Sequence, residues 1–152
     1  MKKKLILVAI FLAIVGCFTL FDAIKMTTEK IVLDSINPTP AVADSQKPVS
    51  VAVTLKGLND EPVSGHNLYA VAENGGAFKA YRVKTDEKGN ANFLYYPYDV
   101  RSYQTVKDAI ITIRDESNSV FIEMCPSVKI KIKMVAPSTE NSGNETTDSF
   151  FK

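Results

Sequence analysis

The chain has 152 residues, which is the length of about one domain. Its 18 basic and 17 acidic residues leave a net charge of only +1, and this balance argues against the basic surface of a nucleic-acid-binding domain. The two cysteines lie in segments of different character, one inside an apolar run and one in a β-rich region, so we expect no disulfide within a domain.

An apolar segment opens the chain. Three lysines at positions 2–4 precede Leu5–Phe21, a run of 17 residues without a charge, and the apolar character continues to Ile24. This length is at the short end of what a hydrocarbon core of about 30 Å requires. The segment has no polar face, which disfavours a buried helix of a soluble protein. Residues 1–24 are therefore predicted to form an N-terminal membrane anchor or signal segment.

The lysines predict the topology of that anchor. Basic residues before an apolar helix stay on the cytoplasmic side, so the rest of the chain is expected to be extracytoplasmic in a single-pass arrangement at the cell membrane. An alternative rests on Ile14-Val15-Gly16-Cys17, which resembles a bacterial lipobox and would make Cys17 a lipid anchor. The apolar run from Phe18 to Phe21 favours the retained helix, since lipoproteins usually turn polar after the lipidated cysteine. A cleaved secretory signal is a third alternative, but the best small-x-small site, at 41–43, lies about 20 residues too far downstream.

Residues 25–47 are interpreted as a juxtamembrane stretch and a linker. The segment Asp22–Asp34 fits either a continuation of the helix or a strand. The segment Ser35–Lys47 is rich in Pro, Ala, Ser and Asp, which is typical of an extended linker.

From Pro48 onward the pattern changes to apolar residues that alternate with polar ones, separated by turn formers. This period of two predicts strands, and seven short strands with frequent turns are typical of a sandwich of immunoglobulin size. We predict an all-β, Ig-like β-sandwich over residues 48–135, after one N-terminal helix, and a disordered polar tail over 136–152. The predicted strands are Val49–Leu55, Leu68–Ala72, Phe78–Val83, Ala91–Tyr95, Ala109–Ile113, Val120–Met124 and Val128–Met134. In the last strand Lys129, Lys131 and Lys133 share one face, which suits a solvated edge strand.

Two loops carry a family resemblance. The stretch Asn59–Gly65 (NDEPVSG) is similar to an N-G-x-P-V-x-G loop, and Thr85–Phe93 (TDEKGNANF) is similar to a T-D-x-x-G-x-A-x-F hairpin. Together they resemble the bacterial Ig-like domains of adhesin and invasin type, and they also look like transthyretin-like and carboxypeptidase-regulatory sandwiches. Asp60 departs from the pattern, because the family loop often has Gly there. The resemblance implies a rigid spacer or binding module at the cell surface, and fold alone does not fix function.

Few residues suggest a catalytic or metal-binding site. His66 is the single histidine, and we expect an exposed residue at the start of a strand rather than part of a catalytic triad or a zinc site. Two oxygen-rich turns, at 86–90 and 115–118, are interpreted as solvated turns, although paired loops at one end of a sandwich leave weak calcium binding open. Cys125 is expected to fill apolar space, with an intermolecular bridge as the alternative. No cofactor and no metal are expected.

Tyr95, Tyr96, Tyr98 and Tyr103 cluster around a proline. They are the best candidate for an interaction surface that binds a partner or a glycan. The competing interpretation is that some of the rings fill the core and one ties down a corner through its hydroxyl. The sequence as a whole predicts a non-enzymatic module, tethered to the membrane, with a protein partner in the cell envelope, serving envelope assembly, surface structure or adhesion. The alternative is a ligand- or glycan-binding receptor that uses the Tyr95–Tyr103 region.

Overall fold

The computed structural model describes residues 2–100, 104–117 and 125–138. Within these ranges the chain forms one long helix, ten strands and one 3-10 turn, in the order α1 (Lys2–Thr28), β1 (Lys30–Asn37), β2 (Ala41–Val42), β3 (Val49–Lys56), η1 (Leu58–Asp60), β4 (Asn67–Ala72), β5 (Ala77–Phe78), β6 (Arg82–Lys84), β7 (Asn90–Tyr96), β8 (Ala109–Asp115), β9 (Ser127–Ile132) and β10 (Met134–Val135).

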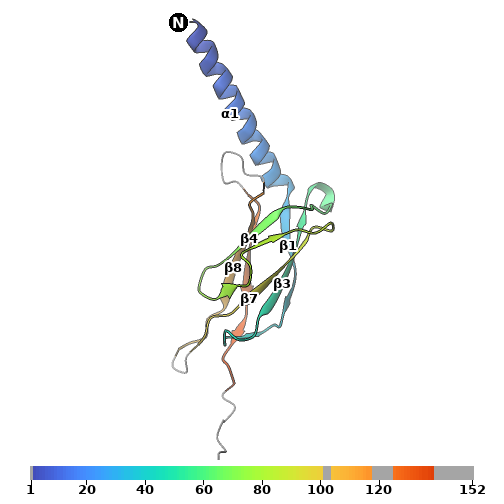
Figure 1. Ribbon diagram of the computed structural model, residues 1–152, viewed down its shortest axis with the longest axis vertical. Coiled ribbons are helices and arrows are strands. Elements are labelled where there is room, and N and C mark those ends of the chain that lie inside the picture. The colour runs from blue at the N-terminus through green and yellow to red at the C-terminus, as the bar shows by residue number, and fades with distance from the viewer. Residues whose placement is uncertain (1, 101–103, 118–124, 139–152) are drawn as a thin grey trace, which may run out of the picture.

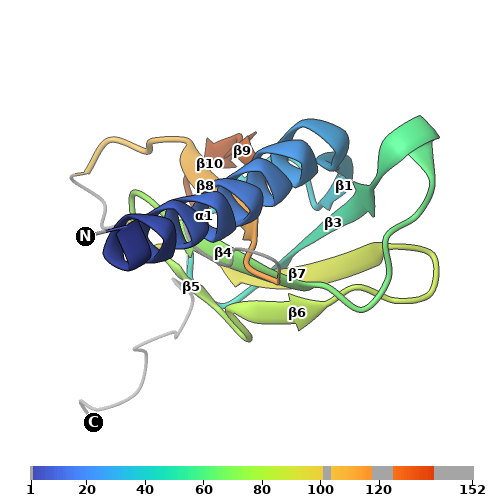
Figure 2. The same ribbon diagram turned by 90° about the horizontal axis from the view of Figure 1, so that it is seen from above.

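The helix α1 projects from one end of the β-sandwich (Figure 1). Its 27 residues make it about 40 Å long at a rise of 1.5 Å per residue. The segment Lys4–Ile24 has a mean hydropathy of 2.6, and its large apolar side chains are exposed along the length of the helix. The helix is thus long and apolar enough to cross a membrane, which confirms the expected N-terminal apolar helix. In the view from above, α1 overlaps the sandwich because the helix extends from that end of the domain toward the viewer (Figure 2).

Eight of the ten described strands form two four-stranded antiparallel sheets that face each other. The first sheet has the order β1-β3-β7-β5 and the second has the order β6-β4-β8-β9. Consecutive side chains point to opposite faces of a strand, so the apolar residues of each strand meet in one core between the sheets. The all-β, Ig-like sandwich predicted from the alternation is confirmed. The fully or almost fully buried side chains of this core include Val49, Val51, Val53, Leu55, Leu68, Ala70, Phe93, Tyr95, Ile111, Ile113, Ile130 and Ile132.

The sandwich begins earlier in the chain than the sequence predicted. β1 pairs with β3 along its whole length, from Lys30 opposite Lys56 to Asn37 opposite Ser50. The register shifts between Leu33 and Ser35, where the strand carries a β-bulge. The helix and this strand are separated by Glu29 alone. Residues 30–37, predicted as part of a juxtamembrane stretch and linker, are therefore an edge strand of the first sheet.

The rest of the predicted linker is also bound to the domain. β2 pairs in parallel with β10, and the Ala41 and Ala43 side chains are fully buried. The Ala41 N–H donates to the Lys133 carbonyl at 2.9 Å, and the Ala43 N–H donates to the Val135 carbonyl at 3.0 Å. The segment has small side chains because it packs against the core, and the same composition is typical of a linker.

The predicted strand Phe78–Val83 is two strands in different sheets. β5 pairs with β7 in the first sheet, whereas β6 pairs with β4 in the second. Phe78 and Val83 are five residues apart, so a single straight strand would place them on opposite faces. The chain crosses from one sheet to the other between them, and both side chains then pack on the core.

The remaining predictions have mixed outcomes. β9 is an edge strand of the second sheet, and Lys129, Lys131 and Lys133 are exposed, as predicted. The last predicted strand is divided into β9 and β10. The predicted strand at 120–124 lies outside the described residues, as does the predicted tail from residue 139 onward.

Candidate functional site

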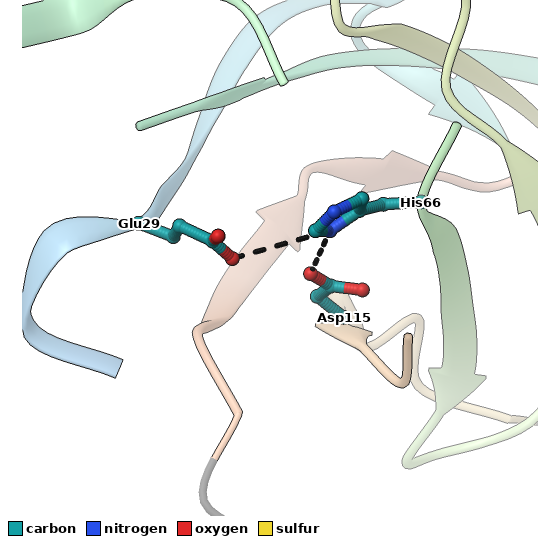
Figure 3. Close-up of side chains that lie close together, drawn as sticks. All are labelled: Glu29, His66 and Asp115. Carbon is teal, nitrogen blue, oxygen red and sulfur yellow. Dashed lines mark hydrogen bonds and ion pairs between the residues drawn. The ribbon is translucent and has the colours of Figure 1, made fainter. Parts of the chain in front are cut away.

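Three ionisable side chains from distant parts of the chain meet at the base of the helix (Figure 3). Glu29 is the residue between α1 and β1, His66 immediately precedes β4, and Asp115 is the last residue of β8. The Nδ1 atom of His66 lies 2.7 Å from Oδ2 of Asp115 and 4.0 Å from Oε2 of Glu29. We call these three residues the junction cluster. It connects the end of the helix to both sheets.

The backbone of His66 is fixed by the hairpin that carries the family-like sequence. The His66 N–H donates to Thr85 Oγ1 at 3.0 Å, and the Thr85 N–H donates to the His66 carbonyl at 2.8 Å. The Thr85 hydroxyl in turn donates to the Val63 carbonyl at 2.9 Å, and its side chain is buried. The Thr that begins the T-D-x-x-G pattern therefore positions the histidine for its partners.

Asp115 is the buried member of the cluster. Its side chain is 2% exposed, Oδ2 contacts the imidazole, and Oδ1 accepts a hydrogen bond from the Ser117 N–H at 2.9 Å. A buried carboxylate costs free energy unless it is paired and hydrogen-bonded, so these contacts explain why the charge is tolerated there. An aspartate held on Nδ1 also fixes the orientation of the imidazole.

The prediction that His66 is an exposed strand-start residue is wrong in one respect. His66 does precede a strand, but its side chain is only 16% exposed. The cause is a partner 49 residues away in the sequence, which local reasoning could not supply. One signal was present: Asp115 has the same strand parity as Ala109, Ile111 and Ile113, and so points toward the core.

The two oxygen-rich turns are occupied by internal contacts. Asp86 Oδ1 accepts hydrogen bonds from the N–H groups of Asn90 and Lys88, each at 2.8 Å, and these bonds, the one from Asn90 above all, hold the pKa of Asp86 below its usual value. In the second turn Asp115 pairs with His66, and Glu116 pairs with Arg82 and Arg114. Asn118 lies outside the described residues. The first turn thus caps itself, as the interpretation of a solvated turn requires.

Two of the four tyrosines in the predicted interaction surface, Tyr95 and Tyr98, have structural roles. Tyr95 is fully buried, packs against Phe78 with ring centroids 5.3 Å apart, and donates its hydroxyl to the Gly75 carbonyl at 2.8 Å. Burial raises the pKa of Tyr95 to about 12. Its assignment to an interaction surface is therefore wrong, because alternation along β7 places it on the inward face with Phe93.

Tyr98 fixes the chain at the corner after β7 through its hydroxyl, which is the competing interpretation of the tyrosine cluster. Its hydroxyl donates to the Lys107 carbonyl and accepts a hydrogen bond from the Lys107 N–H at 2.7 Å. Tyr96 is half-buried, and Tyr103 lies outside the described residues. A shallow groove of about 400 Å³ runs beside this corner, lined by Asn74, Tyr98, Val100, Gln104, Thr105 and Lys107.

The two cysteines are both free thiols. Cys17 is exposed on α1, and the helix continues through it without interruption to Thr28. Cys125 is half-buried just before β9.

No known protein family and no curated protein matches the sequence. Two solved structures resemble the fold. The D0-D1 domain of Intimin is 17% identical with a TM-score of 0.47, over 68% of this chain and 48% of that one. The D00-D0 domain of Intimin is 12% identical with a TM-score of 0.44, over 69% of this chain and 47% of that one. The chain spans about half the length of these structures. At this level of similarity the arrangement of the strands, rather than either neighbour, defines the fold.

Proposed function

We propose that this chain is a non-enzymatic module, anchored in the membrane by α1, that presents an Ig-like sandwich on the extracytoplasmic side and serves a cell-envelope assembly, a surface structure or adhesion. The observation that carries the proposal is the direct passage from α1 into β1 through the single residue Glu29. A helix with an apolar surface all round needs lipid or a large protein core around it. The large apolar side chains of α1 are exposed in this chain, and the helix leads directly into the edge strand β1.

The direct connection between α1 and β1 restricts the orientation of the sandwich relative to the membrane. A flexible linker would let the domain sample many orientations at a distance from the membrane. Here the strand that follows the helix is hydrogen-bonded along its length to β3, and Glu29 at the helix end lies 4.0 Å from His66, which precedes β4. The sandwich is therefore held close to the lipid surface in a defined orientation, which suits a component of an assembly better than a freely moving receptor.

The mode of anchoring can be tested at Cys17. We propose the retained helix, because α1 continues through Cys17 and the large side chains after it, including Phe18 and Phe21, are exposed and apolar. Cells labelled with palmitate should incorporate no label into the wild-type chain, and the mass should correspond to the uncleaved sequence. Label that is present in the wild type and absent from Cys17→Ser would establish the lipid anchor instead.

The assembly role can be tested by site-specific photo-crosslinking in membranes. A photoreactive residue at Asn92 samples the outer face of the first sheet, and one at Lys131 samples the second; both positions are exposed. An assembly component should give one reproducible adduct with a specific protein at one of these faces. The wild-type chain without a photoreactive residue, irradiated in the same way, is the control and should give none. The absence of adducts at every exposed position, with a monomeric chain, contradicts the proposal.

A second candidate function is ligand binding in the groove beside Tyr98. The volume of about 400 Å³ is within the range of small-molecule sites, and Asn74 and Lys107 contribute polar groups to its lining. The substitution Thr105→Trp should fill the groove and abolish binding of a glycan or other small ligand while leaving the thermal melt unchanged. Binding that survives this substitution would remove the candidate.

A further inference from the structure

The side chains of the junction cluster are of the types that bind metal ions, and their ligand atoms lie close together. Its three ligand atoms, one imidazole nitrogen and two carboxylate oxygens, all lie within 4.8 Å of one another. The side chains are 11%, 16% and 2% exposed for Glu29, His66 and Asp115 respectively. We propose that these three residues bind one divalent transition-metal ion of the zinc class, which fastens the end of α1 to the sandwich.

The geometry requires only small side-chain movements. Zinc binds nitrogen and oxygen at about 2.0–2.2 Å in a tetrahedral arrangement, so its ligand atoms stand about 3.3 Å apart. The Nδ1–Oδ2 distance of 2.7 Å and the Nδ1–Oε2 distance of 4.0 Å lie on either side of this value. Glu29 is the most adjustable of the three because its side chain has three rotatable bonds, whereas His66 is fixed through Thr85.

The electrostatics of the cluster also favour a cation. Two carboxylates approach the same imidazole nitrogen, which carries at most one hydrogen. Without an ion, a hydrogen on Nδ1 satisfies Asp115 across this short distance, and 4.0 Å to Glu29 is too long for a hydrogen bond. When the ion binds, Nδ1 supplies its lone pair and the ring hydrogen is carried by Nε2 instead. A divalent ion between the three atoms attracts both carboxylates at once, in a site where burial weakens screening by water.

The ligand types restrict the identity of the ion. Imidazole with carboxylate suits zinc and its neighbours in the first transition series. Calcium requires six to eight oxygen ligands, which two carboxylates do not supply. Three protein ligands leave a fourth position for water, as in an open zinc site. Because the ligands come from the helix–strand junction, the start of β4 and the end of β8, the bound ion would cross-link three elements.

The test is calorimetric titration of zinc chloride into the full chain. The chain is purified in detergent with a histidine-free tag and treated with EDTA. We expect one ion per chain and, at a hundredfold excess over the Kd, a rise in Tm of at least about 5 °C. His66→Asn retains an N–H donor for Asp115 but loses the imidazole ligand. Glu29→Gln keeps the size of the side chain but loses its charge. Each should weaken zinc binding at least about tenfold and remove the Tm rise.

Glu73→Gln is the matched control. It removes an exposed carboxylate, paired with Lys129 at 2.7 Å, from the end of β4 away from the cluster, and it should bind zinc as the wild type does. Two results would overturn the proposal. One is the absence of both heat and a Tm change in the wild type. The other is zinc binding of wild-type strength in both His66→Asn and Glu29→Gln, which would assign the ion to thiols or surface carboxylates. The Tm of each metal-free variant establishes that it is folded.

Discussion

The Nδ1 atom of His66 lies 2.7 Å from the Oδ2 atom of Asp115, and this contact joins the start of β4 to the end of β8 beneath the helix. Removing the imidazole leaves a carboxylate that is 2% exposed with one fewer partner. We expect His66→Ala to lower the free energy of unfolding by about 3 kcal/mol. The chain has no tryptophan, so urea unfolding is followed by tyrosine fluorescence. A change below about 0.5 kcal/mol would show that the pair is dispensable.

A glycine in the family-like hairpin is required by a close backbone contact. Gly89 has a φ of +76°, and a Cβ there would lie 2.6 Å from the Leu55 carbonyl oxygen. Gly65 has a similar φ of +79°, but its nearest neighbour would be 3.7 Å away. We expect Gly65→Ala to cost about 1 kcal/mol, from backbone strain alone, and Gly89→Ala at least about 3 kcal/mol. Equal losses in the two variants, measured by urea unfolding, would rule out the steric explanation.

The departure at Asp60 has a conformational cost. Asp60 adopts a φ of +64° in the loop where the family pattern often has Gly. Its carboxylate forms an exposed ion pair with Lys30 at 2.6 Å, which holds the pKa of Asp60 below its usual value. Exposed ion pairs contribute little to folding stability, so the stability gained by relieving the backbone strain should exceed the stability lost with the ion pair. Asp60→Gly is predicted to raise the Tm. A lower Tm by calorimetry would mean that the ion pair is worth more than the strain.

Two tyrosines on either side of Pro97 should respond differently to loss of a hydroxyl. The Tyr98 hydroxyl exchanges hydrogen bonds with both backbone groups of Lys107, whereas Tyr96 is half-buried at the end of β7. We expect Tyr98→Phe to cost about 1–2 kcal/mol and Tyr96→Phe less than about 0.5 kcal/mol, measured by thermal unfolding. A larger loss for Tyr96→Phe than for Tyr98→Phe would refute the assignment of the corner to Tyr98.

The alternation of apolar residues was sufficient to predict the central strands. Val49, Val51, Val53 and Leu55 are all buried in β3, and the same period holds in β7 and β8. Each of these strands is regular and has one face on the core, so a period of two is visible in the sequence.

The errors arose where that period is interrupted. Ile31 and Ile36 are five residues apart, an odd separation, and the β-bulge in β1 turns both of them inward. Phe78 and Val83 have the same separation, and there the chain changes sheets instead. An odd spacing between apolar residues therefore has two structural solutions, which the sequence alone does not distinguish.

The candidate site depended on long-range contacts. Glu29, His66 and Asp115 are separated by 37 and 49 residues, and they meet only because β1, β4 and β8 begin or end at the same end of the sandwich. The interpretation of 115–118 as a solvated turn is wrong for Asp115, which is buried, and its parity with Ile111 and Ile113 is the signal in the sequence for that burial. That signal could not identify the partner, because the pairing of strands in a sandwich is not local.

The topology of the chain is the central claim, and labelling with a membrane-impermeant maleimide tests it most directly. Single cysteines are placed at Lys2 and at Lys133, which is exposed between β9 and β10, in a chain carrying Cys17→Ser and Cys125→Ser. In sealed right-side-out membrane vesicles, position 133 should react at once, and position 2 should react only after detergent is added. Reaction at position 2 but not at 133 in sealed vesicles, or release of the chain from the membrane by alkaline carbonate, would contradict the account.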